Sequence, residues 1–402
     1  MTRAFAVFAP AIALAILSAG NAAAQAVDQS GPRKFEIDVI GDIIYDSNVA
    51  GVEAANSPSG IKPEDEIGRP SLALDIFLPM GREAVFLKGT AGYDFHAVNT
   101  QLNGPRIDLT GGAQAGLGPC RETLTGSYSL RQTQLYLLPY ALKNLSQNGL
   151  VSFDAECGRQ IGLGTTFAAS EDWSGNQNPT LQIQNYRTFN VSGGLAYRRP
   201  VFGQLSLYGQ YQSTDFTHRF VPVGARLIQD GYQVASGGVR YDRPIGDRME
   251  GIVSLSYSSL EPKIPGETGY KGLDYTGDLI YRFTHRLHAH LTISHMTKPS
   301  NQPGGDYSIA QTYELDADYQ MGPRLDLVLG GGYQSNDYRG IALIPVFFIN
   351  HDRETNIHGS AKYKLGRRLT LGLSVQHTHR DASPAIFSYG DTRADLSITS
   401  TF

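Results

Sequence analysis

The 402-residue sequence contains only two cysteines and a single tryptophan. After residue 24 it also lacks any apolar run approaching the roughly 18 residues that a transmembrane helix needs. Charged residues make up 18% of the chain, and the net charge of -4 leaves no excess of basic side chains. These absences exclude a helical membrane protein and argue against a surface that binds nucleic acid.

Glycine and tyrosine, in contrast, are abundant, with 45 and 22 residues. This composition favours many short strands joined by turns. A chain of this length would ordinarily suggest two soluble domains, but no linker or change of composition divides it. A single large β-barrel accounts for the length better.

The first 24 residues have the features of a secretory signal peptide. Arg3 precedes an apolar run over residues 4–17, and Ala22 and Ala24 provide a cleavage site of the A-x-A type before Gln25. The apolar run is too short to cross a bilayer as a helix, and without a cysteine near Gln25 we expect no lipid attachment. We predict a signal peptide at 1–24, a short periplasmic segment at 25–34 and a barrel over 35–402.

A hairpin unit recurs along the second half of the chain. One strand ends in a tyrosine, a tight turn follows, and the next strand is rich in leucine. The tyrosines of this unit are Tyr197, Tyr241, Tyr281, Tyr319 and Tyr363. Solenoids and propellers also have periods of about 40 residues. The alternation of short turns with long polar loops decides for an outer-membrane barrel.

Extending this pattern to the whole chain predicts an all-β fold, a transmembrane antiparallel up-and-down β-barrel of about 18 strands, with 16 as the alternative. The weakest predicted strands are 71–78 and 147–156. The ninth and tenth are predicted at 204–216 and 232–242, with a loop between them. An even number of strands places both termini on the periplasmic side.

Each predicted strand has a lipid face and a lumen face. In the strand that begins near Arg368, Leu369, Leu371 and Leu373 share one face, and Thr370 and Arg380 lie on the other. The same alternation elsewhere predicts a lumen of mixed charge, which suits a neutral or modestly charged solute. The lumen-lining candidates are Arg240, Arg282, Arg286, Glu314, Asp316, Asp318, Asp326, Lys362, Lys364, Arg368 and Arg380.

Tyrosines gather at both ends of the predicted strands, as in the aromatic girdles of membrane barrels. Besides the tyrosines before the short turns, a second set lies near the long loops: Tyr45, Tyr93, Tyr128, Tyr211, Tyr257 and Tyr333. The final strand alternates apolar and polar residues and stops at Phe402, which resembles the C-terminal insertion signal of outer-membrane barrels. We therefore expect contacts with barrel-assembly machinery, outer-membrane lipid and lipopolysaccharide.

The cysteines Cys120 and Cys157 are predicted to lie at neighbouring ends of the fifth and sixth strands. A disulfide is the expected outcome in an oxidising periplasm, with two free thiols as the alternative. His288 and His290 share one strand face, but no third metal ligand follows at a recognisable spacing. We find no catalytic motif and expect no enzyme activity, metal or cofactor.

Two segments are apolar where surface loops should be polar, residues 135–142 and 341–349. Folded into the barrel mouth, they would form a constriction. The alternative is that they extend strands into the lipopolysaccharide zone. The constriction candidates are Leu137, Pro139, Pro345 and Phe347.

The first predicted strand ends in Tyr45-Asp46-Ser47-Asn48-Val49. This motif, the repeated hairpin and the closing aromatic resemble a family of β-barrel porins often found beside exopolysaccharide assembly and export genes. The resemblance implies a bacterial outer-membrane conduit for exopolysaccharide or capsule secretion, with a periplasmic polysaccharide export protein as a partner. A diffusion porin, general or solute-specific, and a structural or adhesive barrel are the alternatives. Asp46 and Asn48 have a structural interpretation too, as turn residues at the end of the strand.

Overall fold

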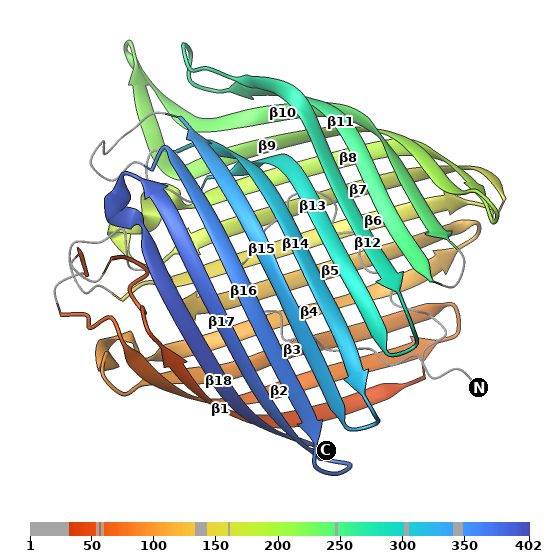
Figure 1. Cartoon of the computed structure of the whole chain (residues 1–402). Helices are drawn as coiled ribbons and strands as arrows, with labels where there is room; N and C mark the ends of the chain where they lie inside the picture. Colours follow the sequence, from red (N-terminus) through yellow and green to blue (C-terminus); the bar gives the residue numbers. More distant parts are fainter. Residues whose placement is uncertain are drawn as a thin grey trace.

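The computed structural model describes residues 32–53, 56–57, 60–132, 143–159, 161–245, 248–300, 305–340 and 349–402. Over these residues the chain forms one barrel of antiparallel strands (Figure 1). The predicted signal peptide lies outside the described residues. No helix in the described part of the chain has the length and hydropathy needed to cross a bilayer.

Eighteen strands are present in the described residues. The first nine are β1 (Lys34–Asp46), β2 (Asp65–Met80), β3 (Glu83–His96), β4 (Gly104–Leu117), β5 (Cys120–Gln132), β6 (Leu145–Gly158), β7 (Gly162–Asn176), β8 (Tyr186–Arg199) and β9 (Gly203–Val223). The others are β10 (Arg226–Ile245), β11 (Met249–Pro262), β12 (Tyr270–Arg282), β13 (Leu287–Pro299), β14 (Tyr307–Met321), β15 (Leu325–Arg339), β16 (His351–Lys364), β17 (Leu369–Ser383) and β18 (Tyr389–Thr401). Short 3-10 helices lie at η2 (Thr100–Leu102), η3 (Pro179–Gln184) and η5 (Ala385–Phe387).

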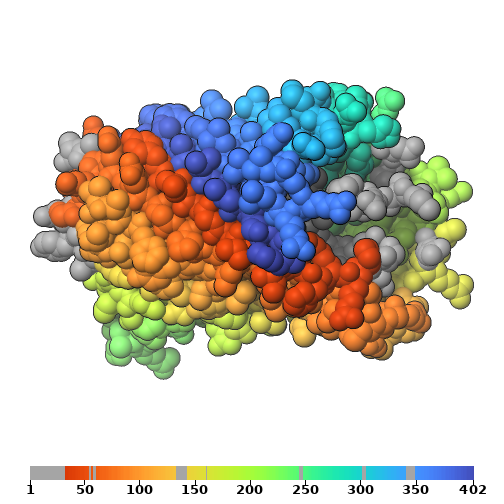
Figure 2. Space-filling model, turned by 90° about the horizontal axis from the view of Figure 1, so that it is seen from below, coloured from red at the N-terminus to blue at the C-terminus, as the bar shows by residue number. Residues whose placement is uncertain are grey.

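The sheet closes because β18 pairs with β1, in a register that sets Asp38 opposite Thr401. In Figure 2 the blue C-terminal strands lie directly against the red N-terminal strand. Closure leaves no strand with an unpaired edge, which a membrane interior requires because lipid cannot replace backbone hydrogen bonds. The predicted fold class is confirmed with 18 strands, and the alternative of 16 is wrong.

Short turns follow the even-numbered strands, and most odd-numbered strands are followed by longer loops. The start of β1 and the end of β18 both lie at the short-turn end, where Thr401 donates its amide to the Arg368 carbonyl.

The prediction of a loop between 216 and 232 is wrong. β9 and β10 continue pairing with each other out to Val223 and Arg226, as a hairpin that projects beyond its neighbours (Figure 1).

The alternation of faces agrees with the sequence. Leu373 and Leu329 expose 52% and 66% of their surface on the outer wall, whereas Arg380 exposes 4%. The loop-side tyrosines Tyr45 and Tyr257 and the turn-side tyrosines Tyr197 and Tyr363 are also among the exposed aromatic residues. Apolar side chains therefore cover the outside between two levels of tyrosine, as expected of a wall in contact with lipid.

Cys120 and Cys157 face each other across β5 and β6 at the short-turn end. They are joined in a disulfide. The bond links strands that are already neighbours, so it fastens the base of the hairpin that carries the loop between Gln132 and Leu145.

Candidate functional site: the lumen and its loop-side closure

The inner wall of the barrel carries charge unevenly. On β2 to β5 the described inward positions hold five basic and four acidic residues: Arg69, Lys88, Arg106, Arg121 and Arg131 with Asp65, Asp75, Asp94 and Asp108. On β11 to β14 they hold two basic and six acidic residues: Arg282 and Lys298 with Glu250, Asp274, Asp278, Glu314, Asp316 and Asp318.

These two walls face each other, because each strand of one group lies nine positions around the 18-stranded ring from a strand of the other. With histidines neutral, the β11–β14 wall is strongly acidic and the β2–β5 wall is slightly basic. The sequence predicted mixed signs around the lumen, but the separation into walls depends on closure of the ring. A positive group passing through the lumen would be drawn toward β11–β14.

Several predicted lumen residues lie in ion pairs along the inner wall. Lys364 donates to Asp326 over 3.0 Å, and Arg282 donates to Glu250 over 3.2 Å. Oδ1 of Asp316 on β14 lies 2.9 Å from Nε2 of His358 on β16, across the intervening strand β15. The lumen-facing sides of β10, β14 and β16 also carry predicted residues at inward positions: Arg240, Glu314, Asp318 and Lys362.

Arg286 and Arg368 are corrections to the predicted lumen. Both lie in short turns between strands, with exposed side chains at the rim of the barrel. Their main-chain carbonyls accept amide hydrogen bonds from Gln320 and Thr401. The sequence prediction extended the strands by one residue too many, because the alternation continues into the turn.

The opposite end of the lumen holds Arg380, which is buried and not free to meet a solute. Its guanidinium pairs with Asp352, whose other partners are the Asn336 amide at 2.7 Å and the Tyr338 hydroxyl at 3.2 Å. This polar network belongs to the loop-side mouth. Arg380, Asn336 and Tyr338 all donate to the Asp352 carboxylate. Arg380 therefore supports the mouth instead of lining an open channel.

Between the two charged walls, the middle of β8 to β11 presents uncharged polar groups. The inward positions carry mainly hydroxyl and amide side chains, and Thr188 and Thr214 approach to 3.0 Å across β8 and β9. Tyr208 adds one aromatic ring on this inner face. The other inward residues of this uncharged wall are Asn190, Ser192, Gln210, Gln212, Ser236, Ser254 and Ser256.

At the loop-side mouth, an apolar cluster gathers side chains from distant parts of the ring. Leu181 of η3 and Phe387 of η5 belong to hairpins on opposite walls, yet both pack into the same buried cluster. The remaining members are Ala50, Val52, Ile61, Leu102, Tyr338 and Ile349. We call this set the mouth cluster. Because its members come from both sides, it narrows the loop-side opening.

The constriction that the sequence predicted is a separate set of residues and stays a prediction. The described residues do not include any of the four constriction candidates, which are Leu137, Pro139, Pro345 and Phe347. Three members, Ala50, Val52 and Ile61, come from the long loop between β1 and β2, and Ile349 is the last residue of the predicted apolar segment 341–349. Sequence reasoning missed the other members because apolar residues scattered through polar loops are common and give no signal until the loops are placed in space.

The Tyr45–Val49 motif closes the seam between the two ends of the chain. Asn48 donates its side-chain amide to the carbonyls of Val52 at 2.8 Å and Gly390 at 3.0 Å. Ser47 Oγ donates to Asp391 and accepts from the Thr392 amide. The motif thus binds the first loop to the start of β18 and carries Ala50 and Val52 into the mouth cluster.

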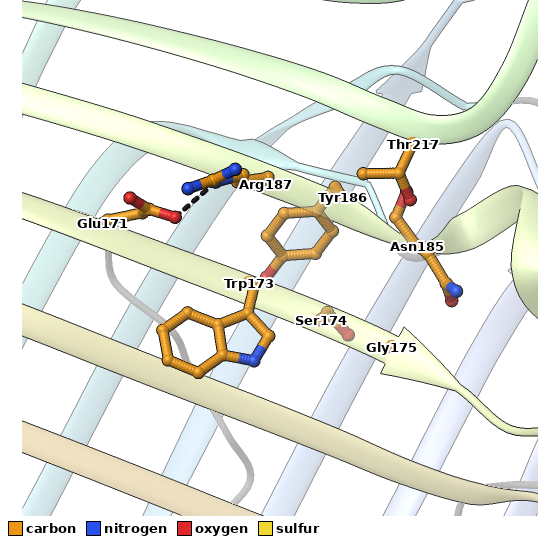
Figure 3. A pocket seen from close by; sticks show the side chains of 8 residues that line it. All are labelled: Glu171, Trp173, Ser174, Gly175, Asn185, Tyr186, Arg187 and Thr217. Carbon is orange, nitrogen blue, oxygen red and sulfur yellow. Dashed lines mark hydrogen bonds and ion pairs between the residues drawn. The ribbon is translucent and has the colours of Figure 1, made fainter.

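A pocket of about 470 Å³ lies at the loop-side ends of β7 to β9 (Figure 3). Its lining includes Trp173, Tyr186 and Thr217, and Arg187 pairs there with Glu171. Trp173 packs across Gly149 on β6, where a Cβ would lie only 2.0 Å from the indole. The exposed faces of Trp173 and Arg187 place the pocket on the outer wall, so it is not part of a path through the lumen.

Residues 207–402 match the model of the family described as "Putative beta-barrel porin 2". This match covers the C-terminal 196 residues of the chain, slightly less than half of its length. With a closed barrel, an apolar outer band and a polar lumen, the protein is a β-barrel porin of the bacterial outer membrane. Porins of this kind are channels, and channel proteins are generally not enzymes. No curated protein matches the sequence.

Among solved structures, the porin resembles OccK2 (OpdF) of Pseudomonas aeruginosa in complex with glucuronate at 12% identity and a TM-score of 0.47, covering 92% of this chain and 98% of that one. A BenF-like porin from Pseudomonas fluorescens Pf-5 gives 12% and 0.48, with 92% and 99% covered. The siderophore receptor PirA from Acinetobacter baumannii gives 7% and 0.47, with 92% and 81% covered. These values are too low to transfer a ligand or mechanism.

Proposed function

We propose that this porin is a conduit through which exopolysaccharide crosses the outer membrane. The observation that supports this cargo most directly is the uncharged wall of β8 to β11. Hydroxyl and amide side chains can exchange hydrogen bonds with sugar hydroxyls. Tyr208 offers an aromatic face to a sugar ring. No deep, convergent binding site interrupts this wall among the described residues, so a polymer would meet many weak contacts instead of one strong one.

The resemblance of the Tyr45–Val49 motif to porins beside polysaccharide export genes supports the same cargo. In this proposal the polymer reaches the short-turn end from a periplasmic export protein and leaves past the mouth cluster. The mouth cluster would open when the polymer pushes from inside, because it joins several loops that can move apart. The barrel itself supplies no chemistry.

A diffusion porin for small solutes is the second candidate, and the separated charges of the lumen favour it. A solute with a positive group would gain from the acidic β11–β14 wall, and a dipolar solute could orient between the two walls. An extended neutral glycan would gain little from this arrangement. The two candidates therefore differ in the wall that the cargo contacts: a glycan contacts the uncharged wall, and a positively charged solute contacts the acidic wall.

The test deletes the gene and measures surface polysaccharide, periplasmic polysaccharide and uptake of small solutes in the same cells. Export predicts polymer lost from the surface and retained in the periplasm.

Complementation then uses a matched pair on β10. Ser236→Trp projects into the lumen from the uncharged wall and should reduce secretion several-fold, whereas Ala235→Trp faces lipid and should restore it. Normal secretion with reduced small-solute uptake would decide for the diffusion porin.

A further inference from the structure

A second group of charged residues lies at the loop-side end, apart from the lumen path and the mouth cluster. Arg219 of β9 is 2% exposed and donates to Asp230 of β10 at 3.1 Å and to Asp306, just before β14, at 2.8 Å. Its Nε also donates to the Ile183 carbonyl of η3. Glu267, from the loop between β11 and β12, completes the group. We call these four charged residues the hairpin cluster.

The hairpin cluster has too much negative charge for its single arginine. The carboxylates of Asp230, Glu267 and Asp306 offer ligand atoms that all lie within 4.8 Å of one another. With Arg219 they sum to a charge of -2 when all are ionised. Buried charge without a counterion is strongly unfavourable. One divalent cation would neutralise the group.

The hydrogen bonding of the hairpin cluster also favours a bound cation. Asp306 is completely buried, and its Oδ2 has no hydrogen-bond partner among the described residues. Both carboxylate oxygens of Glu267 are buried and have no N–H donor in that part of the chain; the acidic group that they approach is the Asp306 carboxylate. Asp230, in contrast, uses Oδ1 to accept the Gly231 amide. Buried oxygens without donors in a folded protein call for an ion or water as partner.

Asp306 is held in this position by its own backbone. Its amide donates to the Arg339 carbonyl at 2.7 Å, and its carbonyl accepts from Ser300 at 3.1 Å. Gly340 packs so closely that a Cβ there would lie 2.5 Å from the Asp306 nitrogen. The backbone of Asp306 is therefore fixed beside the neighbouring negative charges, and its carboxylate is buried among them.

We propose that Asp230, Glu267 and Asp306 bind one calcium ion, which fastens three hairpins to one another at the loop-side end. All three ligands offer carboxylate oxygen, the donor that hard divalent cations prefer. They come from two hairpin loops and a projecting hairpin, and calcium tolerates such irregular geometry with water completing its shell, whereas magnesium demands a regular octahedron. Bound calcium would anchor the projecting β9–β10 hairpin beside η3, which contributes Leu181 to the mouth cluster.

Protons compete with a cation for the same oxygens. Burial, with Asp230 and Glu267 close by, raises the pKa of Asp306 to about 9, although Arg219 opposes the shift. Burial also raises the pKa of Glu267. Tyr232, Tyr307 and Arg339 are further titratable groups near the cluster. Without calcium, the folded state holds a proton that the unfolded state releases, so stability falls as pH rises from about 4 to about 9. Calcium binding must strengthen over the same interval.

The experiment measures the thermal midpoint of the full-length barrel, refolded in detergent, with calcium chloride, magnesium chloride or EDTA. We expect calcium to raise the midpoint by roughly 2 to 5 °C at neutral pH and by less at acidic pH. Calorimetric titration of the folded barrel with calcium chloride provides a second readout that does not depend on unfolding.

Glu267→Gln is the decisive variant because Glu267 makes no pair with Arg219 in the structure. It should lose the calcium shift while its midpoint in EDTA stays equal or rises, since a buried negative charge is removed. Glu261→Gln, at an exposed acidic residue near the end of β11, should keep the shift. The proposal is overturned by a wild type that responds to pH but not to calcium, by an equal response to magnesium, or by a calcium shift that survives in Glu267→Gln.

Discussion

Asn48 holds together parts of the chain that lie far apart in sequence. Its side chain donates to Val52 four residues away and to Gly390, 342 residues away. Sequence reasoning could assign the local half of this role, because asparagine commonly ends strands by bonding nearby backbone. The partner across the seam could not be predicted, since it exists only when β18 lies beside β1.

We expect Asn48→Ala to lower the free energy of unfolding by about 1 to 3 kcal/mol, because two carbonyls near the mouth lose their donor. Urea unfolding of the barrel in detergent measures this change. Asn56→Ala is the matched control: Asn56 is exposed and, among the residues that the structure describes, bonds only Glu53 in the same loop. Similar losses in both variants would contradict a role for Asn48 in closing the seam.

At the scale of strands, the alternation of residues predicted the lipid and lumen faces correctly. It worked because lipid and water impose opposite demands on successive side chains. The same reasoning failed for β9 and β10 beyond Phe216. There the hairpin pairs only with itself outside the ring, so lipid and lumen impose no regular alternation, and residues 217–231 mix apolar and polar side chains without a strand pattern. Gly224, in a left-handed conformation at φ 62°, marks the actual turn.

Leu329 provides a test of the assigned faces. It lies on the outer wall between Tyr319 toward the short turns and Tyr333 toward the loops, so it occupies the middle of the apolar band. Leu329→Arg should destabilise the barrel by about 2 to 4 kcal/mol in lipid vesicles. Ser360→Arg, at an inward position of the adjoining β16, should be tolerated. If Ser360→Arg is the more damaging change, the faces are reversed.

At the scale of the whole molecule, sequence predicted the type of barrel but not how its mouth closes. Strand patterns fix which side of each strand faces the lumen, and this was sufficient for most of the proposed lumen residues. They carry no information on which loops meet above the lumen. The mouth cluster and the hairpin cluster both gather residues from several loops and strand ends, and none of these residues forms a recognisable motif in the sequence.

The mouth cluster leads to a prediction about conductance. Leu181 is 4% exposed within it, so Leu181→Asp would place a charge among apolar side chains from the opposite wall. Burying that charge without a partner costs more than separating the loops, and the mouth should open. We expect a single-channel conductance in planar bilayers several-fold above that of the wild type.

Gln182→Asp is the control for this variant, because it adds the same charge to η3 at a residue outside the mouth cluster. Its conductance should stay close to that of the wild type. If both variants conduct alike, added charge on η3 acts by attracting ions and the mouth cluster does not limit flow. If only Leu181→Asp conducts more, the apolar contact across the mouth restricts the channel, and any polymer that leaves through it must first separate those loops.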